Sequence, residues 1–195
     1  MTQKHEITAA DILPPDVYAA ERAARRRELV ALKRQRRVEV GPFVTFYFEN
    51  FQTMWFQIHE MLHIERGGAE QIGDELAAYN PLVPKGRELV ATFMIEIDNP
   101  ERRKMELLRL GGIEESAFIR FGSDTIASIP EADQDRTSAE GKASSVQFVH
   151  FPFTEAEIAK FKTADDIMLG FRHPHYQHIA MIPPAIRDAL AKDFA

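Results

Sequence analysis

The sequence lacks cysteine altogether, and it also lacks long apolar runs. The absence of cysteine from all 195 residues excludes disulfides, thiol catalysis, Cys-based zinc sites and iron–sulfur ligation by cysteine. No apolar stretch approaches the roughly 18 residues that a membrane-spanning helix needs, and the N-terminal segment has no apolar core of a signal peptide. We therefore expect a cytoplasmic protein without a membrane span, in which any metal is held by His, Asp or Glu.

What is present fits one soluble globular domain. With 45% hydrophobic and 28% charged residues, the chain is long enough and apolar enough to bury a proper core. We expect residues 1–195 to form a single domain, with 1–15 as a flexible N-terminal tail. The segment 130–145 is polar and poor in apolar residues, which predicts a mobile loop.

Basic residues are concentrated in one segment of an otherwise acidic chain. Arg22 to Arg37 contains eight basic side chains against one acid, Glu28, whereas the whole chain has a net charge of −6. The segment reads as a helix that begins near Asp16, and such a helix could bind nucleic acid or an anionic surface. No aromatic stacking platform or nucleic-acid motif accompanies it. We therefore favour a solvated face that pairs with the protein's own acids over a nucleic-acid partner.

A helical pattern dominates the first half of the chain after this segment. Asn50 is the expected N-cap of a central helix whose apolar residues recur every three or four positions. Gly67-Gly68 ends that helix, and a second one, Ala69 to Tyr79, could fold back beside it. Phenylalanine is frequent, with 14 in the chain, so an apolar surface used for homodimerisation is one expectation and burial in the core is the simpler one.

The second half of the chain is richer in strand patterns. Glu88 to Asp98 alternates between apolar and polar residues, which predicts a strand. Thr154 and Glu157 form a capping-box pattern at the start of a short helix. We expect an α+β fold with an antiparallel or mixed sheet of about six or seven short strands. The central two-helix segment would cover this sheet, with additional N- and C-terminal helices.

The central helix contains a metal-ligand motif. His59-Glu60-Met61-Leu62-His63 has the form H-E-x-x-H, in which two imidazoles one turn apart can share Zn²⁺. Glu60, between them, could serve as the general base. A zinc site needs a third protein ligand, and Glu75 on the following helix is the best placed of the nearby carboxylates, which also include Glu65 and Glu70.

Other features of the sequence argue against a zinc protease. The extended metzincin form would need a glycine and a third histidine at the positions of Arg66 and Ala69. Glu60 and His63 also have the E-x-x-H spacing of di-iron bundles, but no second copy of that motif exists in the chain. The alternative is that His59 and His63 flank the apolar stripe as ordinary, partly buried residues.

A second group of histidines lies near the C-terminal end. His173 and His175 are two residues apart and would project to the same face of an extended chain, with His178 nearby and His150 on a strand that could pair beside them. This group is a weaker candidate metal site. Pro174 indicates a turn, and histidines at a turn are commonly surface residues or partners of aromatic rings.

From about Arg36 onwards the chain resembles a bacterial family known as domain of unknown function number three-five-zero-one. The resemblance is carried by short motifs spread over the chain: Phe48-Glu49-Asn50, Thr53, Gln57, Glu60-Met61, Glu65, Glu75-Leu76, Tyr79-Asn80-Pro81-Leu82, Pro84, Ala91-Thr92, Ile95-Glu96, His173-Pro174, Tyr176, Leu190 and Asp193. The family has no established activity, so the resemblance implies no catalytic residue. Its pattern includes Glu60 more firmly than His59, which argues against a protease. The resemblance also implies, through gene neighbourhood, a link to rubrerythrin-like and iron–sulfur redox proteins.

Three hypotheses follow. The first is a non-proteolytic accessory protein, with or without a bound metal, that binds a redox partner and has Glu60, Glu65 and Glu75 near its functional surface. The second is a zinc-dependent hydrolase in which His59, His63 and Glu75 hold the metal and Glu60 deprotonates its water. The third is a nucleic-acid or anionic-surface binder that uses the helix between Arg22 and Arg37.

Overall fold

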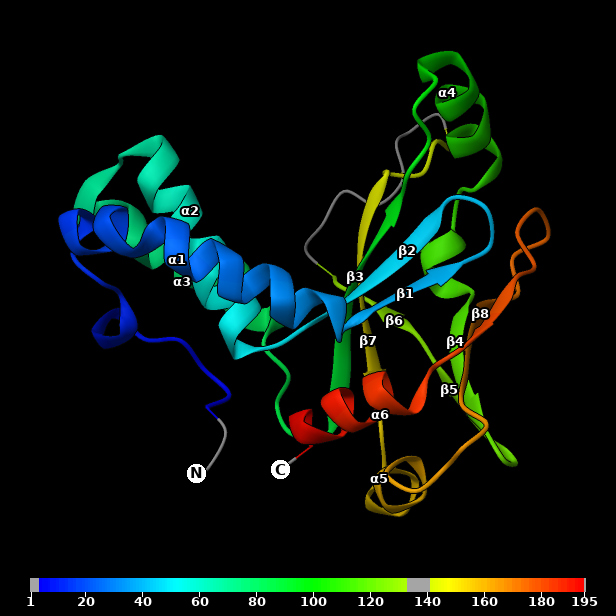
Figure 1. The fold of residues 1–195 in the computed structure, drawn as a ribbon. Coiled ribbons are helices and arrows are strands. Elements are labelled where there is room, and N and C mark those ends of the chain that lie inside the picture. The colour runs from blue at the N-terminus through cyan, green and yellow to red at the C-terminus, as the bar shows by residue number, and fades with distance from the viewer. Residues whose placement is uncertain (1–3, 133–140, 195) are drawn as a thin grey trace.

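The chain folds into two antiparallel sheets with helices packed around them (Figure 1). The computed structural model describes residues 4–132 and 141–194. In this part of the chain, the first sheet has the order β1-β2-β3-β7-β6, formed by Arg37–Val40, Val44–Glu49, Glu88–Ile95, Val146–Pro152 and Ile129–Pro130. The second sheet has the order β5-β4-β8-β9, formed by Asp124–Ala127, Ala117–Phe121, Met168–Phe171 and Ile179–Met181.

The α+β class expected from the sequence is confirmed, but the strand arrangement differs from the expected one. Instead of one sheet with about six or seven strands, the described residues form a five-stranded and a four-stranded sheet. Every pair of neighbouring strands is antiparallel, including β3 with β7 and β4 with β8. These pairings join segments about 50 residues apart, and no local pattern in the sequence specifies them.

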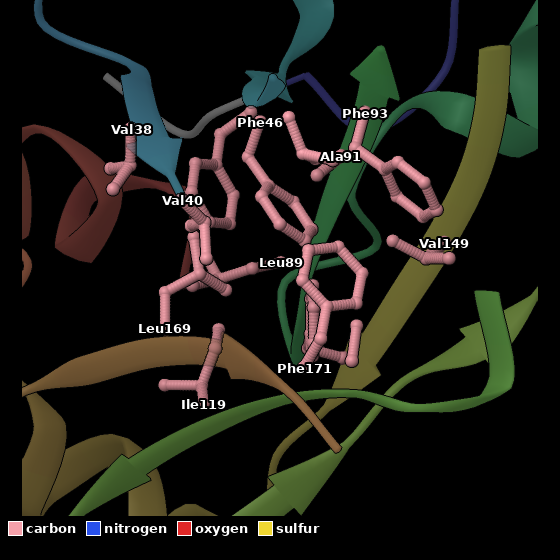
Figure 2. Packing of buried hydrophobic residues seen from close by; sticks show 14 of the residues in the cluster. Val38, Val40, Phe46, Leu89, Ala91, Phe93, Ile119, Val149, Leu169 and Phe171 are labelled. Atoms are coloured by element: carbon pink, nitrogen blue, oxygen red, sulfur yellow. The ribbon is translucent and has the colours of Figure 1, made fainter. Parts of the chain in front are cut away.

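The main hydrophobic core lies between the two sheets. Figure 2 shows Phe46 and Phe93 of the first sheet pointing toward Leu169 and Phe171 of the second. The rings of Phe46 and Phe171 are 5.2 Å apart, within the range of favourable aromatic contact. All 14 phenylalanines are buried or packed against a core, as the simpler of the two expectations has it.

Six α-helices surround the sheets in the described residues. They are α1 Pro15–Arg34, α2 Phe51–Glu65, α3 Gln71–Tyr79, α4 Pro100–Arg109, α5 Glu155–Phe161 and α6 Pro184–Leu190. Short 3-10 helices lie at Ala9–Asp11, Gly68–Glu70, Asn80–Leu82, Ile113–Glu115 and Ala191–Asp193. Figure 1 shows α1, α2 and α3 grouped on one flank of the molecule, away from the second sheet. Every helix in this part of the chain is too short or too polar to cross a bilayer.

The ends of two helices follow the expected capping chemistry. The side chain of Asn50 accepts a hydrogen bond from the Thr53 backbone N–H, which fixes the start of α2. Thr154 and Glu157 exchange hydrogen bonds as a capping box at the start of α5. Both helices therefore begin where the sequence predicts.

A second, smaller core joins α2 to the outer face of the first sheet. Met54 and Ile58 of α2 pack against Val90 of β3 in this cluster. Ile7, in the segment expected to be a flexible tail, is buried in the same cluster, and its backbone exchanges two hydrogen bonds with the Asn80 side chain. Half of the expected mobile loop, residues 133–140, lies outside the described residues, and its first residue, Pro130, belongs to β6.

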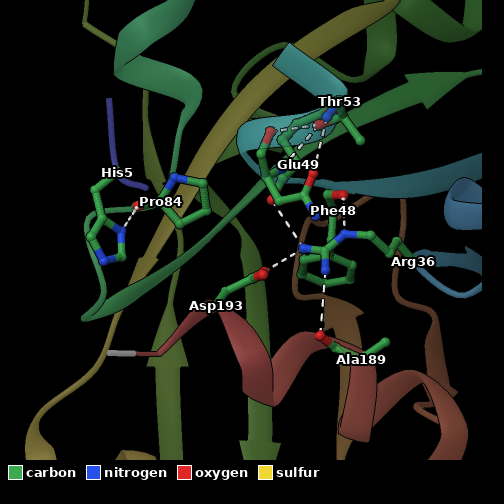
Figure 3. Close-up of polar contacts among 9 residues, drawn as sticks. His5, Arg36, Phe48, Glu49, Thr53, Pro84, Ala189 and Asp193 are labelled. Carbon is green, nitrogen blue, oxygen red and sulfur yellow. Dashed lines mark hydrogen bonds and ion pairs between the residues drawn. The ribbon is translucent and has the colours of Figure 1, made fainter. Parts of the chain in front are cut away.

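A buried ion pair connects the end of α1 to the C-terminal segment. Arg36 and Asp193 are both almost fully buried and their side chains are paired (Figure 3). The Arg36 guanidinium also donates to the carbonyl oxygens of Phe48 and Glu49, each at 3.0 Å. One side chain thus holds together the start of β1, the end of β2 and the C-terminal segment.

Candidate functional site

The H-E-x-x-H segment lies where α1 crosses α2. Tyr18 is the buried residue of α1, and its ring centroid is 4.8 Å from that of His59 and 6.0 Å from that of His63. Trp55 stacks on His59 from the same helix, with ring centroids 3.8 Å apart. The two histidines of the motif therefore face α1, and both contact the ring of Tyr18.

Glu60 is bound by two residues of α1. Arg22 donates from Nε to Oε1 at 2.7 Å and from Nη2 to Oε2 at 2.8 Å, and Tyr18 Oη donates to Oε1 at 2.7 Å. The Arg22 hydrogen bonds outweigh the effect of burial and lower the pKa of Glu60 to about 2. Burial and the bond to Glu60 in turn raise the pKa of the Tyr18 hydroxyl. Glu60 is therefore ionised, with both oxygens occupied.

Both ring nitrogens of His59 have hydrogen-bond partners in the backbone. Nε2 accepts from the Leu13 N–H at 3.0 Å, so the proton is on Nδ1, which donates to the Trp55 carbonyl at 2.7 Å. Burial lowers the pKa of His59, which favours this neutral form. A metal at His59 would need the lone pair of Nε2, and this lone pair already accepts the hydrogen bond from the Leu13 N–H, just before α1.

Glu75, the expected third ligand, lies on α3, which packs beside α2 as expected. Its Oε1 accepts from the Gln71 amide at 2.8 Å, and the same amide donates to Glu65 at 2.6 Å. The two carboxylates are thus bridged by Gln71. In the described ranges, no group of three His, Asp or Glu side chains is arranged so that it could hold a metal ion.

The second histidine group lies on the other side of the first sheet from α2. His173 Nε2 donates to the Gly111 carbonyl at 3.2 Å, and its Nδ1 accepts from the His175 N–H. His178 is exposed and packs against the ring of Tyr176 at 4.5 Å. Because Tyr176 belongs to the core between the sheets and α2 to the smaller core, the two histidine groups do not form one site.

His150 forms a group that the sequence did not reveal. It lies between Glu88 and Glu131, with Nδ1 and Nε2 each 2.9 Å from a carboxylate oxygen. Burial alone would lower the pKa of His150, but the hydrogen bonds and charges of the two carboxylates outweigh it and raise the pKa. The cross-strand pairing of His150 with Val90 explains why Glu88, two residues away on the same face, is within reach. Only the strand register could have indicated this contact.

About half of the basic segment pairs with the protein's own acids, as the favoured interpretation expects. Ion pairs join Arg22 to Glu60, Arg25 to Glu21, Arg36 to Asp193 and Arg37 to Glu39. Arg25 also lies over the Trp55 ring at 4.7 Å. The other basic residues of the segment are Arg26, Arg27, Lys33 and Arg34, and none of them has an ion pair within the described part of the chain.

Comparison with known proteins identifies the family. Residues 6–194 match the family described as "Protein of unknown function (DUF3501)". The chain therefore belongs to this family. A crystal structure of a novel protein of unknown function from Burkholderia pseudomallei K96243, at 1.90 Å resolution, is similar to this DUF3501 protein, with 37% sequence identity and a TM-score of 0.90. The similarity covers 97% of this chain and 99% of that chain. The comparison with curated proteins gave no match.

The DUF3501 membership confirms the resemblance seen in the sequence. The family and the similar crystal structure are both described as being of unknown function, so neither assigns an activity. Four of the residues on which the resemblance was based make contacts described above: Glu60 pairs with Arg22, Glu65 and Glu75 accept from Gln71, and Asp193 pairs with Arg36. Each of these side chains makes contacts inside the protein.

Proposed function

We propose that this DUF3501 protein is a non-proteolytic accessory protein that acts by binding a partner protein, with a rubrerythrin-like or iron–sulfur redox protein as the candidate. The observation that supports this most directly is the bidentate pair between Arg22 and Glu60. The residue that a zinc hydrolase would use as its base is engaged in joining α1 to α2. A structural role therefore accounts for the motif without a reaction.

The chemistry of a general base argues in the same direction. A base must be free to accept a proton from water, and its pKa should lie near the working pH. Glu60 has a pKa of about 2, and its oxygens accept hydrogen bonds from Arg22 and Tyr18. A carboxylate in this state is a poor proton acceptor at neutral pH.

The alternative is a zinc-dependent hydrolase that uses His59, His63 and Glu75. Metal binding would require two hydrogen bonds to break, the one from the Leu13 N–H to His59 and the one from the Gln71 amide to Glu75. His173, His175 and His178 remain a second candidate metal site under this alternative. A nucleic-acid or anionic-surface binder is the other alternative, and it rests on the basic residues between Arg22 and Arg37.

Metal content and peptidase activity decide between the first two functions. The purified, untagged protein would be analysed for zinc and tested on a general protein substrate such as casein, beside His63→Ala and a His173→Ala/His175→Ala double variant. We expect far less than one zinc per chain in all three, and no hydrolysis. About one zinc per chain that is lost only in His63→Ala, together with hydrolysis, would overturn the proposal.

Partner binding tests the positive half of the proposal. The full chain would be titrated against the purified rubrerythrin-like protein of the same organism, and against its iron–sulfur neighbour, by calorimetry. We expect a saturable complex with one of them, whose affinity is unchanged in His173→Ala/His175→Ala. Failure to bind either protein would remove the redox link.

A further inference from the structure

The outward face of α1 forms a shallow groove of about 610 Å³, lined only by residues of this helix. Its floor consists of Ala19, Ala23 and Val30, and Val30 is 48% exposed. These residues share one stripe because they are four, seven and eleven residues apart on a helix. The opposite stripe of α1, centred on Tyr18, packs on α2.

Arginines border the floor on both sides. Arg22 and Arg26 lie along one side of the stripe, and Arg27 and Arg34 lie along the other. Arg27 and Arg34 are seven residues apart, or about two helical turns, so their guanidinium groups are spaced roughly 10 Å along the helix. The groove is therefore an apolar floor between two basic edges.

The positive charge of these edges is largely uncompensated by the protein itself. Arg22 is neutralised by Glu60, but Arg26, Arg27 and Arg34 have no ion pair in residues 4–132 and 141–194. All three are exposed. Three basic residues without an internal ion pair in the described ranges, Arg26, Arg27 and Arg34, therefore line the same groove.

We infer that this groove binds an acidic amphipathic helix of a partner protein. The inference rests on the proposed function and specifies the chemistry of the partner. Small side chains at Ala19 and Ala23 let a second helix approach closely, and an apolar stripe on that helix would cover the floor. Carboxylates on both flanks, repeated at seven-residue intervals, would face Arg27 and Arg34 on one side and Arg26 on the other.

Other occupants fit the groove less well. A nucleic acid would bring phosphates to the arginines, but the groove has no aromatic side chain on which a base could stack, and its floor is apolar. A lipid surface favours helices with Trp, Phe or Leu on the apolar face, and here that face consists of Ala and Val. A second copy of the same face would bring arginines against arginines.

The inference can be tested with synthetic probes and the full chain. The main probe is a fluorescent helical peptide of about 20 residues, long enough to span the roughly 22 Å from Ala19 to Arg34, with an Ala/Leu stripe flanked by glutamates. The comparison probes are a scrambled peptide of the same composition, a single-stranded RNA and a vesicle that contains phosphatidylserine. Fluorescence anisotropy reports the peptides and the RNA, and co-sedimentation reports the vesicle.

Two pairs of variants separate charge from shape. Arg27→Glu/Arg34→Glu reverses one edge of the groove, and Arg102→Glu/Lys104→Glu makes the same charge change on the exposed side of α4. Ala23→Met fills the floor without changing the charge, and Ala20→Met adds the same side chain to α1 outside the groove. Circular dichroism checks that each variant keeps its helical content.

We expect the helical peptide to bind at least tenfold more tightly than the scrambled one. Arg27→Glu/Arg34→Glu and Ala23→Met should each weaken it at least tenfold, with both control variants unchanged. A lysine-for-glutamate peptide should bind the Arg27→Glu/Arg34→Glu protein. Equal binding of both peptides, loss of binding in a control variant, tighter binding of the RNA or vesicle, or no binding would each overturn the inference. If the redox partner binds normally to Arg27→Glu/Arg34→Glu, the proposed function stands and the groove is not its site.

Discussion

Glu60 of α2 and Arg22 of α1 are joined by two roughly parallel N–H···O bonds of 2.7 and 2.8 Å. This fork-like pairing is geometrically specific, since the planar guanidinium matches a carboxylate in both spacing and direction. It fixes the angle at which α1 crosses α2, while Tyr18 packs beneath it.

Glu60→Gln should make the protein less stable at neutral pH and less sensitive to acid. We expect a loss of about 1–2 kcal/mol, at the lower end because the Arg22 side chain is 35% exposed and partly screened. The pKa of Glu60 is about 2 in the fold and 4.5 ordinarily, so its contribution is full above about pH 5 and is lost as the pH falls toward 2. Urea unfolding at several pH values measures this.

The control for Glu60→Gln is Glu70→Gln, at an exposed carboxylate in the turn after α2. It should leave both the stability and its acid dependence close to those of the wild type. If Glu60→Gln gave an acid profile that runs parallel to the wild-type profile, the pairing would not contribute in solution.

His150→Gln should remove a stabilising effect that operates at low pH. Because the pKa of His150 is raised in the fold, the charged imidazole between Glu88 and Glu131 stabilises the protein fully below its unfolded pKa of about 6.5. This contribution is lost as the pH rises through the higher, folded pKa. As the pH rises above about 6.5, the wild-type melting temperature should therefore fall more steeply than that of the variant.

The exposed His175 provides the comparison for this pH dependence. His175→Gln should keep the wild-type slope of melting temperature against pH. A His150→Gln slope equal to that of the wild type would show that His150 is not charged in the fold.

Arg36→Met should be strongly destabilising, by about 3–5 kcal/mol, because it leaves Asp193 buried without its cation. Arg37→Met breaks the neighbouring surface pair with Glu39, whose side chains are 49% and 64% exposed, and should change the stability by less than about 1 kcal/mol. Urea unfolding measures both variants. Similar losses in the two would contradict a special role for the buried pair.

Gly41→Ala should destabilise the turn between β1 and β2 for two reasons, backbone strain at a positive φ and a steric clash of the new Cβ. Gly41 has φ +72°, and a Cβ there would come within 2.6 Å of Tyr176 Oη, which donates to the Val40 carbonyl. Gly122→Ala tests the backbone effect alone, since Gly122 has φ +52° and open space around its Cβ position. We expect about 1 kcal/mol for Gly122→Ala and at least about 2 kcal/mol more for Gly41→Ala, by thermal unfolding.

Local features of this chain were predictable because their causes are local. Asn50 and Thr53 are three residues apart, as are Thr154 and Glu157, so the sequence itself contains the complete capping interaction. The distinction between one sheet and two depends on pairings such as β3 with β7, and strands with similar patterns can pair in many ways.

The candidate site was harder to predict because its key partners are distant. The H-E-x-x-H pattern was visible, but the function of Glu60 depends on Arg22, 38 residues earlier, and that of His59 on a backbone N–H at Leu13. A backbone donor has no sequence signature at all. The partners of His150 became identifiable only when the register placed Glu88 beside it.

The buried pair of Arg36 with Asp193 has a consequence for the synthesis of the protein. Asp193 is translated 157 residues after Arg36, which takes a ribosome roughly 8–30 s at about 5–20 residues per second. During this interval the hairpin of β1 and β2 has already been synthesised with Arg36 beside it, but Asp193, which pairs with Arg36 in the fold, has not. The fold can therefore close only after the segment around Asp193 has been synthesised, and until then the N-terminal part of the chain is the part that a chaperone would have to protect.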